Sequence, residues 1–238
     1  MIDAIRKKLG TGGIYRIVFV GDSLTSTEWV HPNWREIFEY VLKAELEKQI
    51  SDWKIPSWQV RTFNSGLDGA TTRDIREKLP EYVFNIKPDF MMLMIGGNDK
   101  YLLGRDETKE NLHAIIESCQ EQGIKIALST DPRLFNAKYD EKDRDLRKIV
   151  RSFQDRVDIF TDLHELMREE PLEKFFTFIS ENGNEDAGIK PGEIDYCHPN
   201  MYGNAVMAQY FLKSIFGISF DPHIYLNDVD AGVMYPNY

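Results

Sequence analysis

Short apolar runs alternate with longer amphipathic stretches along most of the chain. The short runs are rich in β-branched and aromatic residues, which is typical of buried strands, and they cover residues 15–20, 58–63, 90–95, 124–129 and 157–160. The longer stretches carry apolar residues three and four positions apart and predict helices over residues 34–46, 71–79, 107–122, 140–153 and 199–216. Because strand and helix alternate, the pattern predicts one parallel sheet with helices on both faces, an α/β fold of three α/β/α layers.

The order of the strands decides which turns lie side by side. In the common flavodoxin-like order 2-1-3-4-5, the first strand lies between the second and the third. The turns that follow these three strands are then adjacent at the carboxyl edge of the sheet, where parallel α/β sheets bind their ligands. We expect this five-stranded order.

No linker rich in proline, glycine and serine divides the chain, so we expect a single domain over residues 1–238, with residues 218–238 as a C-terminal surface extension. Residues 171–194 interrupt the alternation and are too long for a plain connection. They are either a lid or binding loop, or a helical turn followed by a solvated acidic loop.

Charge and composition exclude several classes of partner. The chain has 39 acidic and 29 basic residues, and its net charge of −10 opposes binding to nucleic acid and to anionic membranes. Cys119 and Cys197 are too few for a disulfide framework or a four-cysteine metal site. The first residues do not lead into a long apolar stretch, and nothing later spans a membrane. We expect a cytoplasmic protein without stable membrane insertion, unless a leader peptide was removed.

Ser23 follows the first predicted strand directly, in the sequence GDSLT at residues 21–25. A serine at such a turn is often only a turn residue or a helix cap. Acyl transfer, however, requires a nucleophile, a base, a group that orients the base, and donors for the oxyanion. Ser23 is the candidate nucleophile and its backbone N–H one donor, Gly66 the candidate second backbone donor, and Asn98 the candidate side-chain donor.

His198 is the candidate base, because Asp195 precedes it by three residues in DYCHPN at residues 195–200. In a turn before a helix, this spacing lets the carboxylate bind Nδ1–H and leaves Nε2 free to face Ser23. Each candidate also has a structural interpretation: Asp195 and His198 as helix caps, Gly66 as a turn residue and Asn98 as a bridge between loops.

These motifs resemble those of the SGNH hydrolase family, also called GDSL-type lipases and esterases. GDSLT (21–25), NSG (64–66), GGND (96–99) and DYCHPN (195–200) occur in the family's order, and the αβ pattern extends to about Gly217. The resemblance implies a serine esterase that forms an acyl-enzyme and needs no cofactor or metal. It assigns Ser23, Asp195 and His198 as the triad, and Ser23, Gly66 and Asn98 as the oxyanion hole.

The resemblance implies a small-molecule acyl ester as substrate and leaves open its acyl chain and its alcohol, whether short-chain, lipid-like or an acetylated carbohydrate. It does not specify the oligomeric state. Trp29, His31, Tyr101 and Leu102 are candidate pocket walls, although core packing explains them nearly as well.

Two other functions fit parts of the sequence. An acyltransferase on the same scaffold would share the acyl-enzyme and differ only in the acceptor. The hydroxyl-rich residues 23–27 also resemble the phosphate loop of flavodoxins, which would make the chain an FMN-binding protein. That alternative leaves Asp195 and His198 without a role.

Overall fold

The chain folds around a parallel sheet. The computed structural model describes residues 1–185 and 187–238, and its five strands have the order β2-β1-β3-β4-β5. All neighbouring strands are parallel, and the strands are β1 (Tyr15–Gly21), β2 (Val60–Gly66), β3 (Phe90–Met94), β4 (Lys125–Ser129) and β5 (Ile159–Thr161). The predicted order 2-1-3-4-5 is confirmed.

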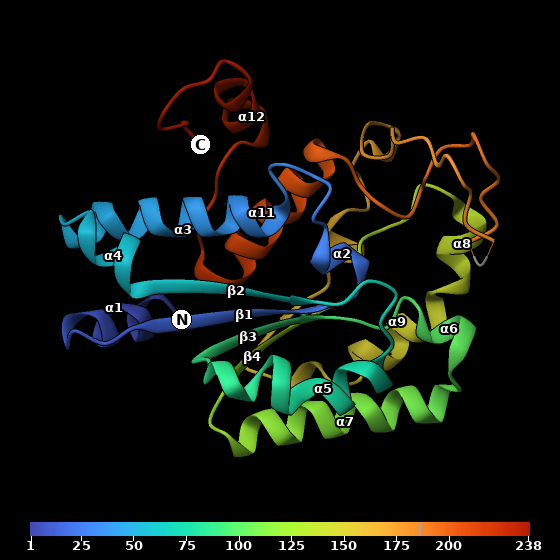
Figure 1. Cartoon of the computed structure of the whole chain (residues 1–238), viewed down its shortest axis with the longest axis horizontal. Helices are drawn as coiled ribbons and strands as arrows, with labels where there is room; N and C mark the ends of the chain where they lie inside the picture. Colours follow the sequence, from blue (N-terminus) through green and yellow to red (C-terminus); the bar gives the residue numbers. More distant parts are fainter. Residues whose placement is uncertain (186) are drawn as a thin grey trace.

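Helices cover both faces of the sheet, which confirms the three-layer α/β/α fold. One face packs against α1 (Ile2–Gly10), α3 (Trp34–Ile50) and α11 (Met201–Phe216), and the other against α5 (Thr72–Tyr82), α7 (Arg105–Glu121) and α9 (Arg144–Arg151). Figure 1 shows α3 and α11 above the sheet and α5 and α7 below it. Side chains alternate along each strand, so Phe19 enters the first core and Val18 the second.

Shorter elements connect these layers. They are α2 (Ser23–Ser26), α4 (Lys54–Gln59), α6 (Asp99–Leu102), α8 (Ala137–Lys142), α10 (Leu163–Leu166), α12 (Pro222–Asp230) and the 3₁₀ turns η1 (Phe84–Ile86), η2 (Gln154–Arg156) and η3 (Leu172–Lys174). Helices α2 and α6 follow β1 and β3 at the carboxyl edge of the sheet, on the right in Figure 1.

Local signals in the sequence explain where several helices begin and end. Asn33 accepts hydrogen bonds from the first turn of α3, and the Glu36 carboxylate accepts one from the Asn33 N–H, which is the capping box that their spacing predicts. Gly217 ends α11 with φ +71°, a conformation that glycine adopts without strain.

Two predicted boundaries are wrong because backbone pairing outweighs local composition. Residues 54–59 form α4 rather than the start of a strand, and Trp58 is 64% exposed. Strand β2 instead runs from Val60 to Gly66, because its pairing with β1 begins at Val60 and ends at Gly66. Helix α5 continues past Pro80, since proline removes one backbone donor while Val83 N–H still reaches the Leu79 carbonyl.

The remaining differences lie in the second half of the chain. The predicted helix over residues 140–153 is divided into α8 and α9, with Asp143 between them. The extension at residues 218–238 contains α12, which was not predicted. Asp221 caps α12, and Tyr225 and Leu226 are buried in the first core.

The segment at residues 171–194 is anchored at one end and forms a loop at the other. Phe175 and Phe176 are fully buried in the first core. Bridges between Ile179 and Ile194 and between Asn184 and Ile189 hold the rest, of which Asp186 lies outside the described residues. The first part is therefore core rather than lid.

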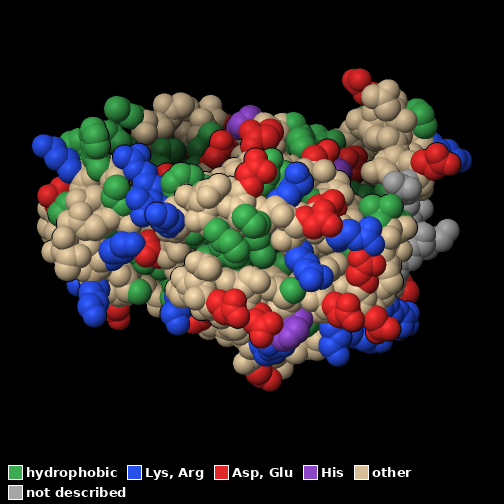
Figure 2. Space-filling model, turned by 60° about the horizontal axis from the view of Figure 1, so that its bottom comes forward, with side chains coloured by type: hydrophobic (Ala, Val, Ile, Leu, Met, Phe, Trp, Pro, Cys, Tyr) green, Lys and Arg blue, Asp and Glu red, His purple; other side chains and the backbone are tan. Residues whose placement is uncertain are grey.

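Acidic and basic side chains are interspersed on the face that contains α5 and α7, as Figure 2 shows. No helix in the described part of the chain has both the length and the apolar composition needed to cross a membrane.

Candidate active site

Ser23 lies at the carboxyl end of β1 as the first residue of α2. The preceding Asp22 caps this turn, and its Oδ1 accepts a hydrogen bond of 3.1 Å from the Leu24 N–H. A Cβ on Gly21 would lie 2.2 Å from the Met94 carbonyl oxygen, so only glycine lets the chain leave the strand here. We call residues 21–27 the Ser23 turn.

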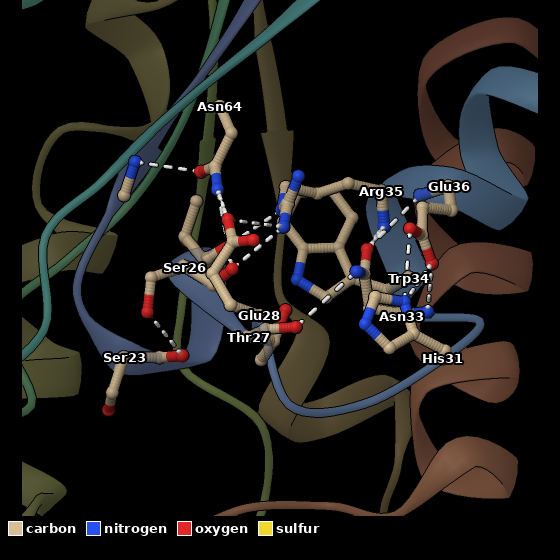
Figure 3. A network of polar contacts seen from close by, with 12 residues as sticks. Ser23, Ser26, Thr27, Glu28, His31, Asn33, Trp34, Arg35, Glu36 and Asn64 are labelled. Carbon is tan, nitrogen blue, oxygen red and sulfur yellow. Dashed lines mark hydrogen bonds and ion pairs between the residues drawn. The ribbon is translucent and has the colours of Figure 1, made fainter.

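Side chains from other elements hold the carbonyl groups of the Ser23 turn (Figure 3). Trp34 Nε1 donates to the Leu24 carbonyl at 2.8 Å. Arg35 donates from Nε to the Thr25 carbonyl at 2.5 Å and from Nη2 to the Ser26 carbonyl at 2.7 Å. The Ser23 hydroxyl points away from this network in Figure 3. The network therefore fixes the backbone of the turn and leaves the hydroxyl free.

Arg35 is itself held in place by a contact with Glu28. Its side chain is 11% exposed and lies 3.7 Å from the carboxylate of Glu28. Asn64, at the end of β2, donates to the Ser26 carbonyl at 3.3 Å and to Glu28 at 2.5 Å. These contacts connect the Ser23 turn to β2 and α3.

His198 and Asp195 contact Ser23 from the other end of the chain. His198 Nε2 lies 2.9 Å from Ser23 Oγ, and His198 Nδ1 lies 2.7 Å from Asp195 Oδ2. The structure thus brings together three residues that span more than two thirds of the sequence. This is the arrangement by which a carboxylate fixes a histidine tautomer and the histidine takes a proton from a serine.

Backbone contacts hold the segment that carries these two residues, which we call the His198 loop (residues 194–200). Asp195 N–H donates to the Phe178 carbonyl at 2.8 Å, and Asn200 N–H to the Phe175 carbonyl at 2.6 Å. Asp195 Oδ1 also accepts the N–H groups of Cys197 at 2.8 Å and His198 at 3.2 Å. The buried Phe175 anchors the whole loop to the core.

The charges of the His198 loop suit this arrangement. Burial acts to raise the pKa of Asp195, but hydrogen bonds from His198 and from two backbone N–H groups outweigh it and hold the pKa below its ordinary value. Asp195 is therefore ionised at neutral pH. Burial raises the pKa of the Cys197 thiol to about 12, so this thiol stays neutral and is a poor nucleophile.

A cavity of about 280 Å³ opens beside Ser23 and His198. Tyr101 and Leu102 line it, as predicted. The ring of Trp29 meets the His198 ring edge to face, with centroids 5.4 Å apart, and is half exposed. His31 instead lies 3.3 Å from Glu36.

The predicted oxyanion donors Asn98 and Gly66 lie in different surroundings. Asn98 lines the cavity, and its Nδ2 donates one hydrogen to the Ala70 carbonyl at 3.0 Å, while its second hydrogen has no acceptor in the described part of the chain. Gly66 N–H donates to Asn64 Oδ1 at 3.0 Å. Gly66 is not among the described residues that line the cavity. A Cβ on Gly66 would lie 2.4 Å from Ser26 N, so glycine here allows close packing on the Ser23 turn.

Gly69, three residues further on, lines the cavity with φ +69°. Within the described residues its N–H has no hydrogen-bond acceptor. Gly69 was not among the predicted donors, although a second glycine in the same loop is a sequence signal for it.

Asp131, two residues after β4, also lines the cavity and was not singled out by the sequence. Its place at the carboxyl end of a strand next to β3 is the signal that could have found it. As for metal ions, no group of three or more His, Cys, Asp or Glu side chains in the described ranges is arranged to hold one.

Comparison with known proteins identifies relatives of this chain. The model of the GDSL-like lipase/acylhydrolase family matches residues 19–206. An acetylxylan esterase from Geobacillus stearothermophilus is 25% identical over 127 residues, which cover 52% of this chain and 57% of that protein. An uncharacterized lipoprotein, YqeF, from Bacillus subtilis (strain 168) is 34% identical over 75 residues, 29% of this chain and 31% of that protein. The chain thus matches little more than half the length of the first relative and about a third of the second.

Solved structures of similar fold cover nearly the whole chain. Axe2, an acetylxylan esterase from Geobacillus stearothermophilus, aligns with a TM-score of 0.63 and 19% identity over 88% of this chain and 97% of its own. Its catalytic mutants replace a serine, an aspartate or a histidine by alanine. A lipase/acylhydrolase from Enterococcus faecalis aligns with a TM-score of 0.62 and 20% identity over 86% of this chain and 96% of its own.

The family model begins within β1 and ends within α11, so it includes both the Ser23 turn and the His198 loop. The strand order, the position of Ser23 after β1 and the approach of His198 to Ser23 agree with that match. The chain belongs to the GDSL-like lipase/acylhydrolase family.

Proposed function

We propose that this protein is a serine esterase that hydrolyses acyl esters through an acyl-enzyme. Ser23 is the nucleophile, His198 the general base and Asp195 the group that orients His198. The observation that carries the proposal is the chain of two contacts, 2.9 Å from Ser23 Oγ to His198 Nε2 and 2.7 Å from His198 Nδ1 to Asp195 Oδ2. Family membership and the serine, aspartate and histidine mutants of Axe2 support it.

The reaction has two halves. Ser23 Oγ attacks the ester carbonyl carbon while its proton moves to His198 Nε2, and the carbonyl oxygen becomes an oxyanion. When the carbon–oxygen bond to the alcohol breaks, the alcohol leaves with the proton from Nε2. A water molecule then attacks the carbonyl carbon of the acyl-enzyme while its proton moves to His198 Nε2. The bond between this carbon and Ser23 Oγ breaks, the acid leaves, and Ser23 Oγ takes the proton back from Nε2.

Three groups are proposed as oxyanion donors. They are the backbone N–H of Ser23, the free hydrogen of Asn98 Nδ2, and the backbone N–H of Gly69 in place of the predicted Gly66. The position of Gly69 in the cavity wall and the engagement of Gly66 N–H by Asn64 support this exchange. Such donors stabilise charge that develops only in the transition state.

The cavity favours short acyl groups and polar alcohols. Its volume is about 280 Å³, and charged side chains form part of its wall, namely Asp22, Asp68, Lys100, Asp131 and Asp143. A long alkyl chain would cover these charged groups and take them out of water without replacing their hydrogen bonds, which is costly. We therefore propose short-chain esters, acetate above all, as substrates.

A series of p-nitrophenyl esters from acetate to decanoate tests this function. We expect the protein to hydrolyse the acetate fastest and Ser23→Ala to lose about 10⁴-fold or more in kcat. Ser118→Ala, in α7 on the far side of the sheet, is the matched control and should retain activity. Full activity in Ser23→Ala, or a preference for decanoate, would refute the corresponding part of the proposal.

A further inference from the structure

Asp131 presents an unused hydrogen-bonding group to the cavity. It lines the same cavity as Ser23 and His198. Its Oδ1 is shielded from solvent and has no hydrogen-bond partner among the residues that the structure describes, while the residue as a whole is partly exposed. A ligand in the cavity can therefore reach the exposed part of this carboxyl group, to which the described residues supply no hydrogen bond.

The neighbours of Asp131 do not supply that partner. A Cβ on Gly97 would meet Asp131 Oδ2 at 3.0 Å and Asp22 Oδ2 at 3.4 Å, so the two carboxyl groups converge on the same glycine. Neither carboxylate can donate a hydrogen bond to the other unless one of them is protonated.

The basic residues nearby are engaged elsewhere. The charged groups that face Asp131 are Asp22, Asp99, Lys100, Asp143 and Arg147. Lys100 is paired with Asp143, and Arg147 donates to Asp140 at 3.4 Å and to its backbone carbonyl at 2.7 Å. Asp131 therefore lies beside a second carboxyl group, and neither Lys100 nor Arg147 donates a hydrogen bond to it among the described contacts.

This environment keeps the carboxyl group uncharged over part of the physiological range. Burial first, and then the charge of Asp143, raise the pKa of Asp131 to about 7. Burial and the charge of Asp131 also raise the pKa of Asp22. A protonated carboxyl group both donates and accepts a hydrogen bond, which matches a hydroxyl group.

We propose that Asp131 is a specificity-determining residue that hydrogen-bonds a hydroxyl group in the alcohol portion of the ester. The inference rests on the proposed esterase function, in which the acyl portion is too small to carry that hydroxyl. An anionic group would be repelled by Asp22, Asp68 and Asp143, which share the cavity wall. The ligand class is thus an ester of a polyhydroxy alcohol without an anionic group.

A matched pair of substrates isolates this contact. Glycerol monoacetate and propyl acetate have the same carbon skeleton and the same ester, and they differ only in two hydroxyl groups. We expect the protein to favour glycerol monoacetate in kcat/KM. We expect Asp131→Leu to reduce that preference about tenfold, as for the loss of one good hydrogen bond, while propyl acetate is hydrolysed nearly as before.

Two further variants make the result decisive. Asp131→Asn keeps a neutral donor and acceptor, and should retain most of the preference. Asp106→Leu removes an exposed carboxylate from the first turn of α7, and should leave the preference unchanged. An unchanged ratio in Asp131→Leu, an equal loss in Asp106→Leu, or an Asp131→Asn that behaves like Asp131→Leu would each overturn the inference.

The Ser23→Ala protein separates this inference from the proposed function. If Ser23→Ala is inactive on both acetates and Asp131→Leu keeps the preference, only the role of Asp131 is wrong. If Ser23→Ala hydrolyses both acetates normally, the esterase mechanism is wrong and the role of Asp131 falls with it. Thermal unfolding of each variant shows whether it is folded.

Discussion

The Ser23 turn and the His198 loop meet at one cavity, but different kinds of contact hold them. In the Ser23 turn, side chains from α3 and β2 bind the backbone carbonyl groups of Leu24, Thr25 and Ser26. In the His198 loop, backbone N–H groups bind the carbonyl groups of Phe175 and Phe178 and the carboxylate of Asp195. In the first region side chains from other elements bind the backbone carbonyl groups, whereas the second is held by its own backbone N–H groups together with the side chain of Asn204, which donates to the carbonyl groups of Pro199 and Asn200.

This difference predicts how each region responds to substitution. A change in Arg35 or Asn64 acts on Ser23 through the backbone of the turn, so its effect is indirect and graded. A change in Asp195 acts on His198 through one hydrogen bond, so its effect is direct and large. The two regions meet at the contact of 2.9 Å between Ser23 Oγ and His198 Nε2.

The largest effect is expected in the His198 loop, for Asp195→Asn. An asparagine amide can donate to Nδ1 and thereby stabilise the tautomer that carries its proton on Nε2, which cannot accept the Ser23 proton. We expect kcat to fall about 10⁴-fold with little change in KM. Steady-state hydrolysis of p-nitrophenyl acetate measures this, and a loss of less than tenfold would mean that Asp195 does not orient the base.

The second largest loss of activity is expected for a residue in the cavity between the two regions. Asn98→Ala removes a side-chain donor and leaves both the Ser23 turn and the His198 loop intact. We expect kcat to fall about 10²–10³-fold while the KM for p-nitrophenyl acetate changes little. An unchanged kcat would exclude the amide of Asn98 from the oxyanion hole.

A smaller effect is expected for the Ser23 turn itself. Arg35→Met removes both hydrogen bonds to the carbonyl groups of Thr25 and Ser26, and we expect about a tenfold loss in kcat, with Arg35→Lys intermediate. The rate at which an organophosphate labels Ser23 should fall in parallel, which a loss of stability alone would not produce in folded protein. The exposed Arg61 offers the control Arg61→Met, and equal losses in both variants would contradict the comparison.

The smallest effect is expected in how the stability of the folded protein depends on pH, through the titration of Asp131. Its folded pKa of about 7 lies above the unfolded value of 3.8, so the folded protein binds more protons between these values and loses stability as pH rises through that range. Asp131→Asn does not titrate. Its melting temperature should therefore exceed that of the parent protein by a few degrees above about pH 7, and the difference should shrink toward pH 4. A difference that is the same at both ends would disprove the raised pKa.

The sequence predicts the sheet and most of the site because those signals are local. The apolar runs mark the strands, and the alternation of strand and helix implies that neighbouring strands are parallel. The order 2-1-3-4-5 is the common one for such a sheet. Asp195 and His198 are three residues apart, so a single turn decides their contact. The approach of His198 to Ser23 then follows from the shared edge of the sheet.

The features that the sequence did not predict depend on tertiary contacts. Gly66 and Gly69 belong to one loop, and the Asn64 side chain decides which N–H is free by accepting that of Gly66. The start of β2 is set by pairing with β1 and not by the aromatic Trp58. Asp131 is a lone aspartate after a strand, and only its position beside Asp22 and Gly97 in the cavity wall distinguishes it from a solvated one.

The most direct test of the account is covalent labelling of Ser23 by a serine-directed organophosphate, followed by mass spectrometry of the digested protein. The account predicts one label per chain, located on Ser23, and a labelling rate that falls by orders of magnitude in His198→Ala because Nε2 no longer removes the Ser23 proton. A label on another serine, or equal labelling rates in the parent protein and His198→Ala, would contradict it.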